Sequence, residues 1–85
     1  MRIKVITRPV VDSTELQRLM TETLQAMEDD YKNCQFGGIM KLQEPDEHGC
    51  NWSPPMIRCS GIPGAVCEAA AAIVTKDFQP KYNIE

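Results

Sequence analysis

The stretch from Cys50 to Val74 constrains the fold most, because it joins a strand pattern to a helix pattern through one short turn. It contains three of the four cysteines and the only tryptophan. Residues 56–59 alternate in polarity, which predicts a strand with its odd-numbered residues inward. Gly61-Ile62-Pro63-Gly64 then predicts a turn, since glycine and proline mark turns and proline suits the first turn of a helix. The helix that follows is expected to bury Val66, Ala70, Ile73, Val74 and Phe78.

The first third of the chain predicts a strand followed by a helix. Residues 2–8 alternate between charged and apolar side chains, as in a strand. Asp12-Ser13-Thr14-Glu15 is typical of a helix start, because a short side chain there accepts from free backbone N–H groups. Apolar residues continue at helical spacing to about Tyr31. The acidic run Glu28-Asp29-Asp30 opposes the helix dipole near that end.

The middle and the C-terminus add further strand patterns. Residues 36–43 predict a strand with a bulge or close approach at Gly37-Gly38 and with Met40 facing inward. Residues 44–55 form a polar loop rich in turn-forming residues. Residues 81–85 fit either a short edge strand or a frayed tail.

The predicted order is strand, helix, strand, strand, helix and an optional last strand. It predicts a single α+β domain over residues 1–85, built as a two-layer sandwich. The order is similar to the ferredoxin-like fold, which has an antiparallel sheet with both helices on one face. This similarity is architectural, and no residue motif extends it to a named family or an activity.

Composition narrows the class of protein. The chain has 85 residues, 42% hydrophobic residues and a net charge of −3, which is typical of a small globular domain. We expect a cytoplasmic protein without membrane contact, because there is no signal-peptide pattern and no apolar run of membrane-spanning length. In that compartment the cysteines are expected to be free thiols.

Strand parity predicts a basic surface on the open side of the sheet. Alternation places Arg2, Lys4, Lys41 and Arg58 there, and such a surface attracts an anionic ligand, RNA or a complementary subunit. No aromatic residue shares this predicted face, although RNA-binding sheets usually stack bases on aromatic side chains. The alternative is an ordinary solvated sheet face.

Two further features are candidate binding positions. Gly61 and Gly64 precede a helix, where free N–H groups favour an anion, but the same turn also serves a plain strand-to-helix connection. Trp52 lies in a polar loop, and it fits either a partner anchor or a lid over the core.

The ligand-like residues follow the spacing His48-x-Cys50-x8-Cys59-x7-Cys67. This spacing lacks a C-x-x-C pair and matches no standard zinc pattern. We therefore expect no metal, no cofactor and no catalytic residue, with Cys59 and Cys67 as packing residues.

These patterns predict a small non-catalytic binding domain that acts through its open sheet face, with self-association as one route. One alternative is a binder of nucleic acid or another anion that uses the basic face and the Gly61–Gly64 turn. Another is a thiol or zinc protein that uses Cys50 and His48.

Overall fold

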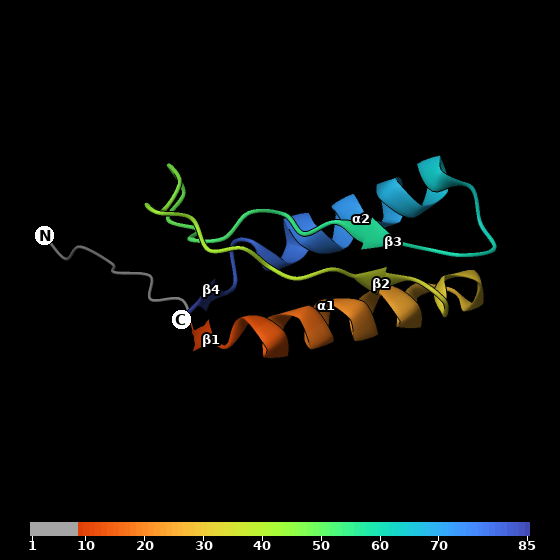
Figure 1. Ribbon diagram of the computed structural model, residues 1–85, viewed down its shortest axis with the longest axis horizontal. Coiled ribbons are helices and arrows are strands. Elements are labelled where there is room, and N and C mark those ends of the chain that lie inside the picture. Colours follow the sequence, from red (N-terminus) through yellow and green to blue (C-terminus); the bar gives the residue numbers. More distant parts are fainter. Residues whose placement is uncertain (1–8) are drawn as a thin grey trace, which may run out of the picture.

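The computed structural model describes residues 9–85. Two helices run antiparallel along the length of the molecule, and a pair of extended segments runs lengthwise between them (Figure 1). The elements in chain order are β1 (Val10–Val11), α1 (Ser13–Met27), the 3-10 turn η1 (Asp29–Tyr31), β2 (Gln35–Phe36), β3 (Ile57–Arg58), α2 (Gly64–Phe78) and β4 (Asn83–Ile84). None of the described helices is long and apolar enough to cross a bilayer.

Helix α1 begins where the sequence predicts. The side chain of Asp12 accepts from the backbone N–H of Thr14 at 3.4 Å and caps the first turn. Leu16, Met20 and Leu24 are buried along one face. The helix ends at Met27 rather than near residue 31, since the acidic residues that follow it oppose the helix dipole.

The two segments between the helices form one antiparallel ribbon, defined here as residues 34–42 and 51–59. Its register is constant: β2 pairs Phe36 with Ile57, and Leu42 N still donates to Asn51 O at 2.8 Å near the other end. Regular strand is confined to two residues on each side. The reason lies in Pro54 and Pro55, which have no N–H to donate to the ladder.

The glycine pair in the ribbon interrupts the alternation of its side chains. Phe36 is buried, Ile39 packs against the core, and Met40 is 73% exposed. The prediction that Met40 faces inward is therefore wrong. Gly37 and Gly38 have no side chains that could pack inward. The inward-facing positions therefore shift by one residue across this pair.

Helix α2 turns a different face to the core than the sequence suggests. Val66 and Ile73 are 43% and 60% exposed, which corrects the predicted stripe. The buried face consists of Cys67, Ala70, Ala71, Val74, Thr75 and Phe78. Ala70 and Ala71 of this face belong to the same core cluster as the buried residues of α1.

The C-terminal residues form a strand rather than a frayed tail. β4 pairs in parallel with β1, with Val10 opposite Asn83 and Val11 opposite Ile84. Within the described residues there are two separate two-stranded sheets, β1–β4 and β2–β3. The α+β class is confirmed, whereas the ferredoxin-like order is not, and the strand predicted over residues 2–8 lies outside the described residues.

Side chains of α1 cover the free edge of β2. Gln17 donates to Phe36 O at 2.8 Å, and Gln25 donates to Cys34 O at 3.0 Å. Between them, the hydroxyl of Thr21 accepts from Phe36 N at 3.2 Å. These three helix residues lie four apart, so one face of α1 satisfies backbone groups that a neighbouring strand would otherwise pair.

Candidate functional site

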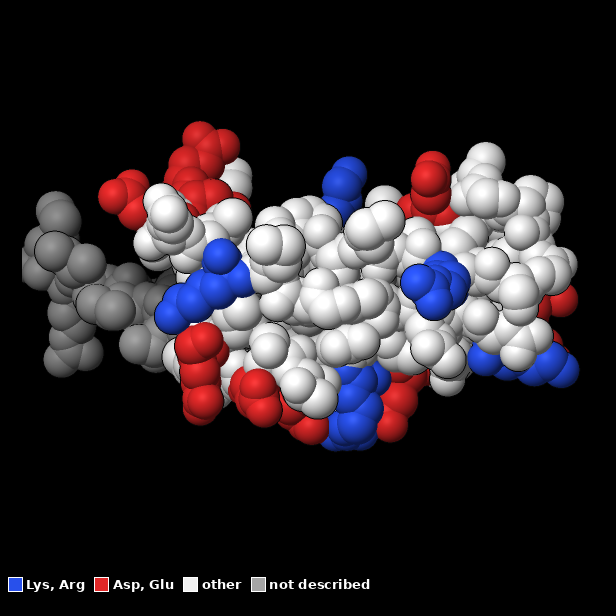
Figure 2. Space-filling model, viewed as in Figure 1, with Lys and Arg blue, Asp and Glu red and all other residues white. Residues whose placement is uncertain are grey.

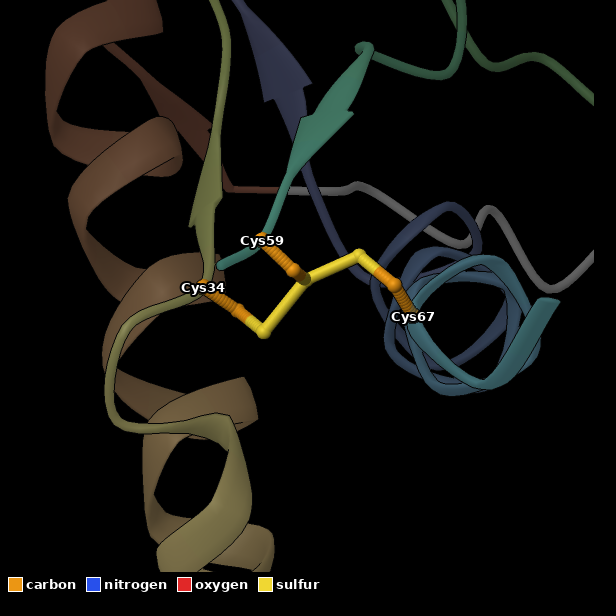
Figure 3. Close-up of side chains that lie close together, drawn as sticks. All are labelled: Cys34, Cys59 and Cys67. Atoms are coloured by element: carbon orange, nitrogen blue, oxygen red, sulfur yellow. A yellow bond between two sulfur atoms is a disulfide. The ribbon is translucent and has the colours of Figure 1, made fainter. Parts of the chain in front are cut away.

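Three cysteines converge at the end of the ribbon farther from the C-terminus (Figure 3). The sulfur atoms of Cys34, Cys59 and Cys67 all lie within 4.8 Å of one another. Cys34 immediately precedes β2, Cys59 immediately follows β3, and Cys67 lies in the first turn of α2. The cluster thus joins both sides of the ribbon to the second helix.

The ribbon register explains why two of these cysteines meet. Cys34 and Cys59 are the next pair after Gln35 and Arg58, and their Cα atoms are 4.1 Å apart. Because Gly37 N donates to Met56 O, alternation makes Cys34 and Cys59 a pair without backbone hydrogen bonds. Side chains approach most closely at such pairs in an antiparallel ladder.

The turn after β3 brings in the third cysteine. Gly61 adopts a φ of +86°, a left-handed conformation that favours glycine, and it lets the chain reverse into α2. The helix starts at Gly64, so Cys67 faces back toward the ribbon, with its Cα 6.2 Å from that of Cys59. The Gly61–Gly64 turn therefore positions a cluster member.

The sulfur of Cys59 lies within bonding distance of both other sulfurs. One divalent sulfur holds one disulfide at a time, so the cluster contains at most one disulfide and always keeps a third sulfur outside it. This differs from the expectation of four free thiols and of Cys59 and Cys67 as mere packing residues. The three side chains form a chemical unit.

The three cysteines differ in their exposure to solvent. Cys34 is fully buried and Cys67 is 4% exposed, whereas Cys59 is half-buried. A hollow of about 260 Å³ at the surface is lined by Ile57, Arg58, Cys59, Ile62, Gly64, Cys67 and Glu68. Solvent molecules thus reach Cys59 directly, while the buried Cys67 lines the same hollow beside one basic and one acidic side chain.

The predicted pair of His48 and Cys50 lies elsewhere. Cys50 is buried near the other end of the ribbon, where its thiol donates to Trp52 O at 3.4 Å. His48 is exposed, with its Nε2 3.4 Å from a carboxylate oxygen of Glu47. Sequence spacing missed Cys34, because its contact with Cys59 depends on strand register, and no local pattern encodes that.

The predicted basic surface is only partly described. Arg2 and Lys4 lie outside the described residues, while Lys41 and Arg58 are exposed. Arg58 pairs with Gln35, six residues along the ribbon from Lys41, so the two cations are separated by roughly 20 Å. Figure 2 accordingly shows a largely uncharged band across this face rather than a basic patch.

Trp52 belongs to the core. Its side chain is fully buried, and its Nε1 donates to Tyr82 O at 2.9 Å. It therefore ties the ribbon to the segment before β4 and offers no exposed surface to a partner.

A second hollow lies along the ribbon, with a volume of about 450 Å³. Met40 and Met56 line it and are 73% and 84% exposed. Arg58 and the exposed Pro54 also contribute. Of the basic residues predicted for the open sheet face, Arg58 lines this hollow, whereas the sequence predicts Met40 on the opposite, inward face.

No protein family, no curated protein and no solved structure matches this chain. The three-cysteine cluster is therefore the feature on which a function can be built.

Proposed function

We propose that this chain is a small metal-binding domain in which Cys34, Cys59 and Cys67 hold one thiophilic cation as thiolates. The observation that carries the proposal is the convergence of three sulfur atoms within 4.8 Å, from three different elements. Thiolates select soft and borderline cations such as Cu⁺ and Zn²⁺. Around a tetrahedral Zn²⁺ with bonds of about 2.3 Å, neighbouring sulfurs lie roughly 3.8 Å apart. Cys59 lies at bonding distance from both other sulfurs, so the reduced side chains must rotate apart to reach that spacing.

Three protein ligands leave a coordination position open. Sites that keep such a position exchange or activate a small ligand, whereas structural zinc sites are closed by four protein ligands. The hollow beside Cys59 and Cys67 gives a water molecule or a small thiol access to this position. We therefore infer an exchangeable site rather than a purely structural one.

The cation would also stabilise the fold. The three ligands link the start of β2, the end of β3 and α2, so binding to the folded state alone lowers its free energy. A chain of 85 residues has a limited core, which makes such a contribution a large share of its total stability.

Cobalt(II) titration of the fully reduced protein under anaerobic conditions tests this proposal. We expect one Co²⁺ per chain, with the sulfur-to-cobalt charge-transfer absorption of thiolate ligation. Cys34→Ser, Cys59→Ser and Cys67→Ser should each weaken binding strongly. Cys50→Ala is the matched control, because Cys50 is buried but outside the cluster, and it should leave the titration unchanged. Absence of thiolate absorption, or equal loss in Cys50→Ala, would contradict the proposal.

The exposed methionines favour a second function. We propose that the ribbon face around Met40 and Met56 binds a second copy of the chain, because methionine side chains form adaptable apolar contacts. Light scattering over a range of concentrations should show a dimer that Met56→Glu weakens. Met27→Glu, on α1, serves as the control, since Met27 is 40% exposed but does not line this hollow. A monomer at every concentration would rule this function out.

A further inference from the structure

We infer that the same cluster performs internal thiol–disulfide exchange, with Cys59 as the sulfur shared by two alternative disulfides. The inference uses the cluster of the proposed function but does not depend on the cation. It describes the oxidised protein, whereas the metal site belongs to the reduced one.

The backbone already accommodates both bonds. Cα atoms of disulfide-bonded cysteines usually lie about 4.4–6.8 Å apart. The Cα atom of Cys59 lies 6.2 Å from that of Cys67, within this range, and 4.1 Å from that of Cys34, just below it. Changing from one disulfide to the other therefore needs side-chain rotation rather than movement of a strand or helix.

Burial gives the three sulfurs different roles. Cys59 and Cys67 line the surface hollow, and Cys34 lies behind them with no exposed surface. An external disulfide therefore reacts first with the thiolate of Cys59, the half-buried member, and Cys67 at the wall of the hollow is the nearer second thiol. The first turn of α2 and Arg58 favour negative charge on Cys67, while Glu68 in the same hollow opposes it.

The chemistry balances with a low-molecular-weight disulfide as the oxidant. One cysteine thiolate attacks it, forms a mixed disulfide and releases one small thiolate. The second cysteine thiolate then attacks the protein sulfur of that mixed disulfide, closes the Cys59–Cys67 bond and releases the other small thiolate. Overall two protein thiols are oxidised and one external disulfide is reduced to two thiols.

The internal step needs no further oxidant. The thiolate of Cys34 attacks the sulfur of Cys59, a Cys34–Cys59 bond forms, and the Cys59–Cys67 bond breaks. Cys67 leaves as a thiolate and takes a proton from solvent in the hollow. The disulfide then joins Cys59 to the fully buried Cys34 instead of to Cys67. A link between the ribbon and α2 is replaced by a link within the ribbon.

Time-resolved disulfide mapping tests this inference. The metal-free Cys50→Ala protein is oxidised briefly with oxidised glutathione, freed of the reagent, and then alkylated and digested at intervals. We expect the Cys59–Cys67 peptide pair first, followed by growth of the Cys34–Cys59 pair to a constant ratio with no added oxidant. Cys34→Ser and Cys67→Ser, each in the same background, provide the two single disulfides as reference samples.

The inference is overturned if one disulfide forms and its share stays constant after the oxidant is removed. The key time course uses a protein with all three cluster cysteines, so a cluster-cysteine variant that fails to fold does not affect it. Exchange without Co²⁺ binding would remove only the metal-binding proposal. Co²⁺ binding without exchange would remove only this inference.

Discussion

The side-chain amide of Asn51 pairs with both backbone groups of Ile84. Asn51 Nδ2 donates to Ile84 O at 2.7 Å, and Ile84 N donates to Asn51 Oδ1 at 2.8 Å. The amide thus takes the position that a peptide group of a neighbouring strand would occupy along β4. Asn83 adds to the contact, since its amide accepts from Asn51 N at 3.3 Å and donates to Gly49 O at 3.1 Å. The ribbon is joined to the C-terminal strand by side chains rather than by a continuous sheet.

Asn51→Ala should destabilise the fold. The substitution leaves the N–H and C=O of the buried Ile84 without these partners, which we expect to cost about 1–3 kcal/mol. Asn33→Ala is the control, because Asn33 is exposed and surface substitutions usually change stability by less than about 0.5 kcal/mol. Urea unfolding measures the free energy of unfolding of both variants. Equal midpoints for the two variants would show that the Asn51 contact contributes nothing.

Thr21→Val should remove the acceptor that α1 offers to β2. Phe36 N donates to the Thr21 hydroxyl at 3.2 Å, and valine leaves this N–H unpaired at a cost of about 1–3 kcal/mol. Thr23→Val is a matched control on the same helix, since the exposed Thr23 hydroxyl only donates to Leu19 O within α1. Amide hydrogen exchange at Phe36 should accelerate in Thr21→Val but not in Thr23→Val. Unchanged exchange would mean that the edge of β2 is protected in another way.

Two alanine substitutions in the turn before α2 should have opposite signs. Gly61→Ala forces a residue with a Cβ into a φ of +86°, which costs about 1–2 kcal/mol. Gly64→Ala, at the first position of α2, meets no atom within 4 Å and should stabilise by about 0.4–1 kcal/mol. Thermal unfolding distinguishes the two. A lower melting temperature for both would contradict the assigned role of Gly61.

An exposed charge cluster on α1 gives a pH-dependent prediction. Arg18 pairs with Glu15, and its Nη1 also lies 2.8 Å from a carboxylate oxygen of Glu22. The hydrogen bond from Arg18 lowers the pKa of Glu15 below its ordinary value. A lowered folded pKa contributes stability above the unfolded pKa, and this contribution is lost as the pH falls through the folded pKa.

Arg18→Ala should therefore raise the pKa of Glu15 toward its ordinary value, as followed by NMR titration of the Glu15 carboxyl. The stability difference from the wild type should shrink as the solution becomes more acidic, because a protonated Glu15 no longer pairs with Arg18. Arg58→Ala, on the ribbon, should leave the Glu15 titration unchanged. A Glu15 pKa that is the same with and without Arg18 would refute this account.

Local features of the structure could be predicted because their causes are local. Asp12 caps α1 through an N–H two residues away, and the apolar spacing from Leu16 to Leu24 selects the buried face. The outward position of Met56 follows from strand alternation and is confirmed by its exposure. The tendency of residues 81–85 toward a strand was also readable, although its parallel pairing with β1 was not.

Local sequence patterns located the two helices, the segments that form β3 and β4, and the glycine turn, since each depends on neighbours within a few residues. Which segments pair, and in what register, depends on tertiary contacts. That register places Cys34 opposite Cys59 across 25 residues of chain, and the turn at Gly61 adds Cys67. Local sequence patterns do not indicate these contacts, because the cysteines are far apart in the chain. Closure of the loop and packing of the ribbon on both helices bring them together.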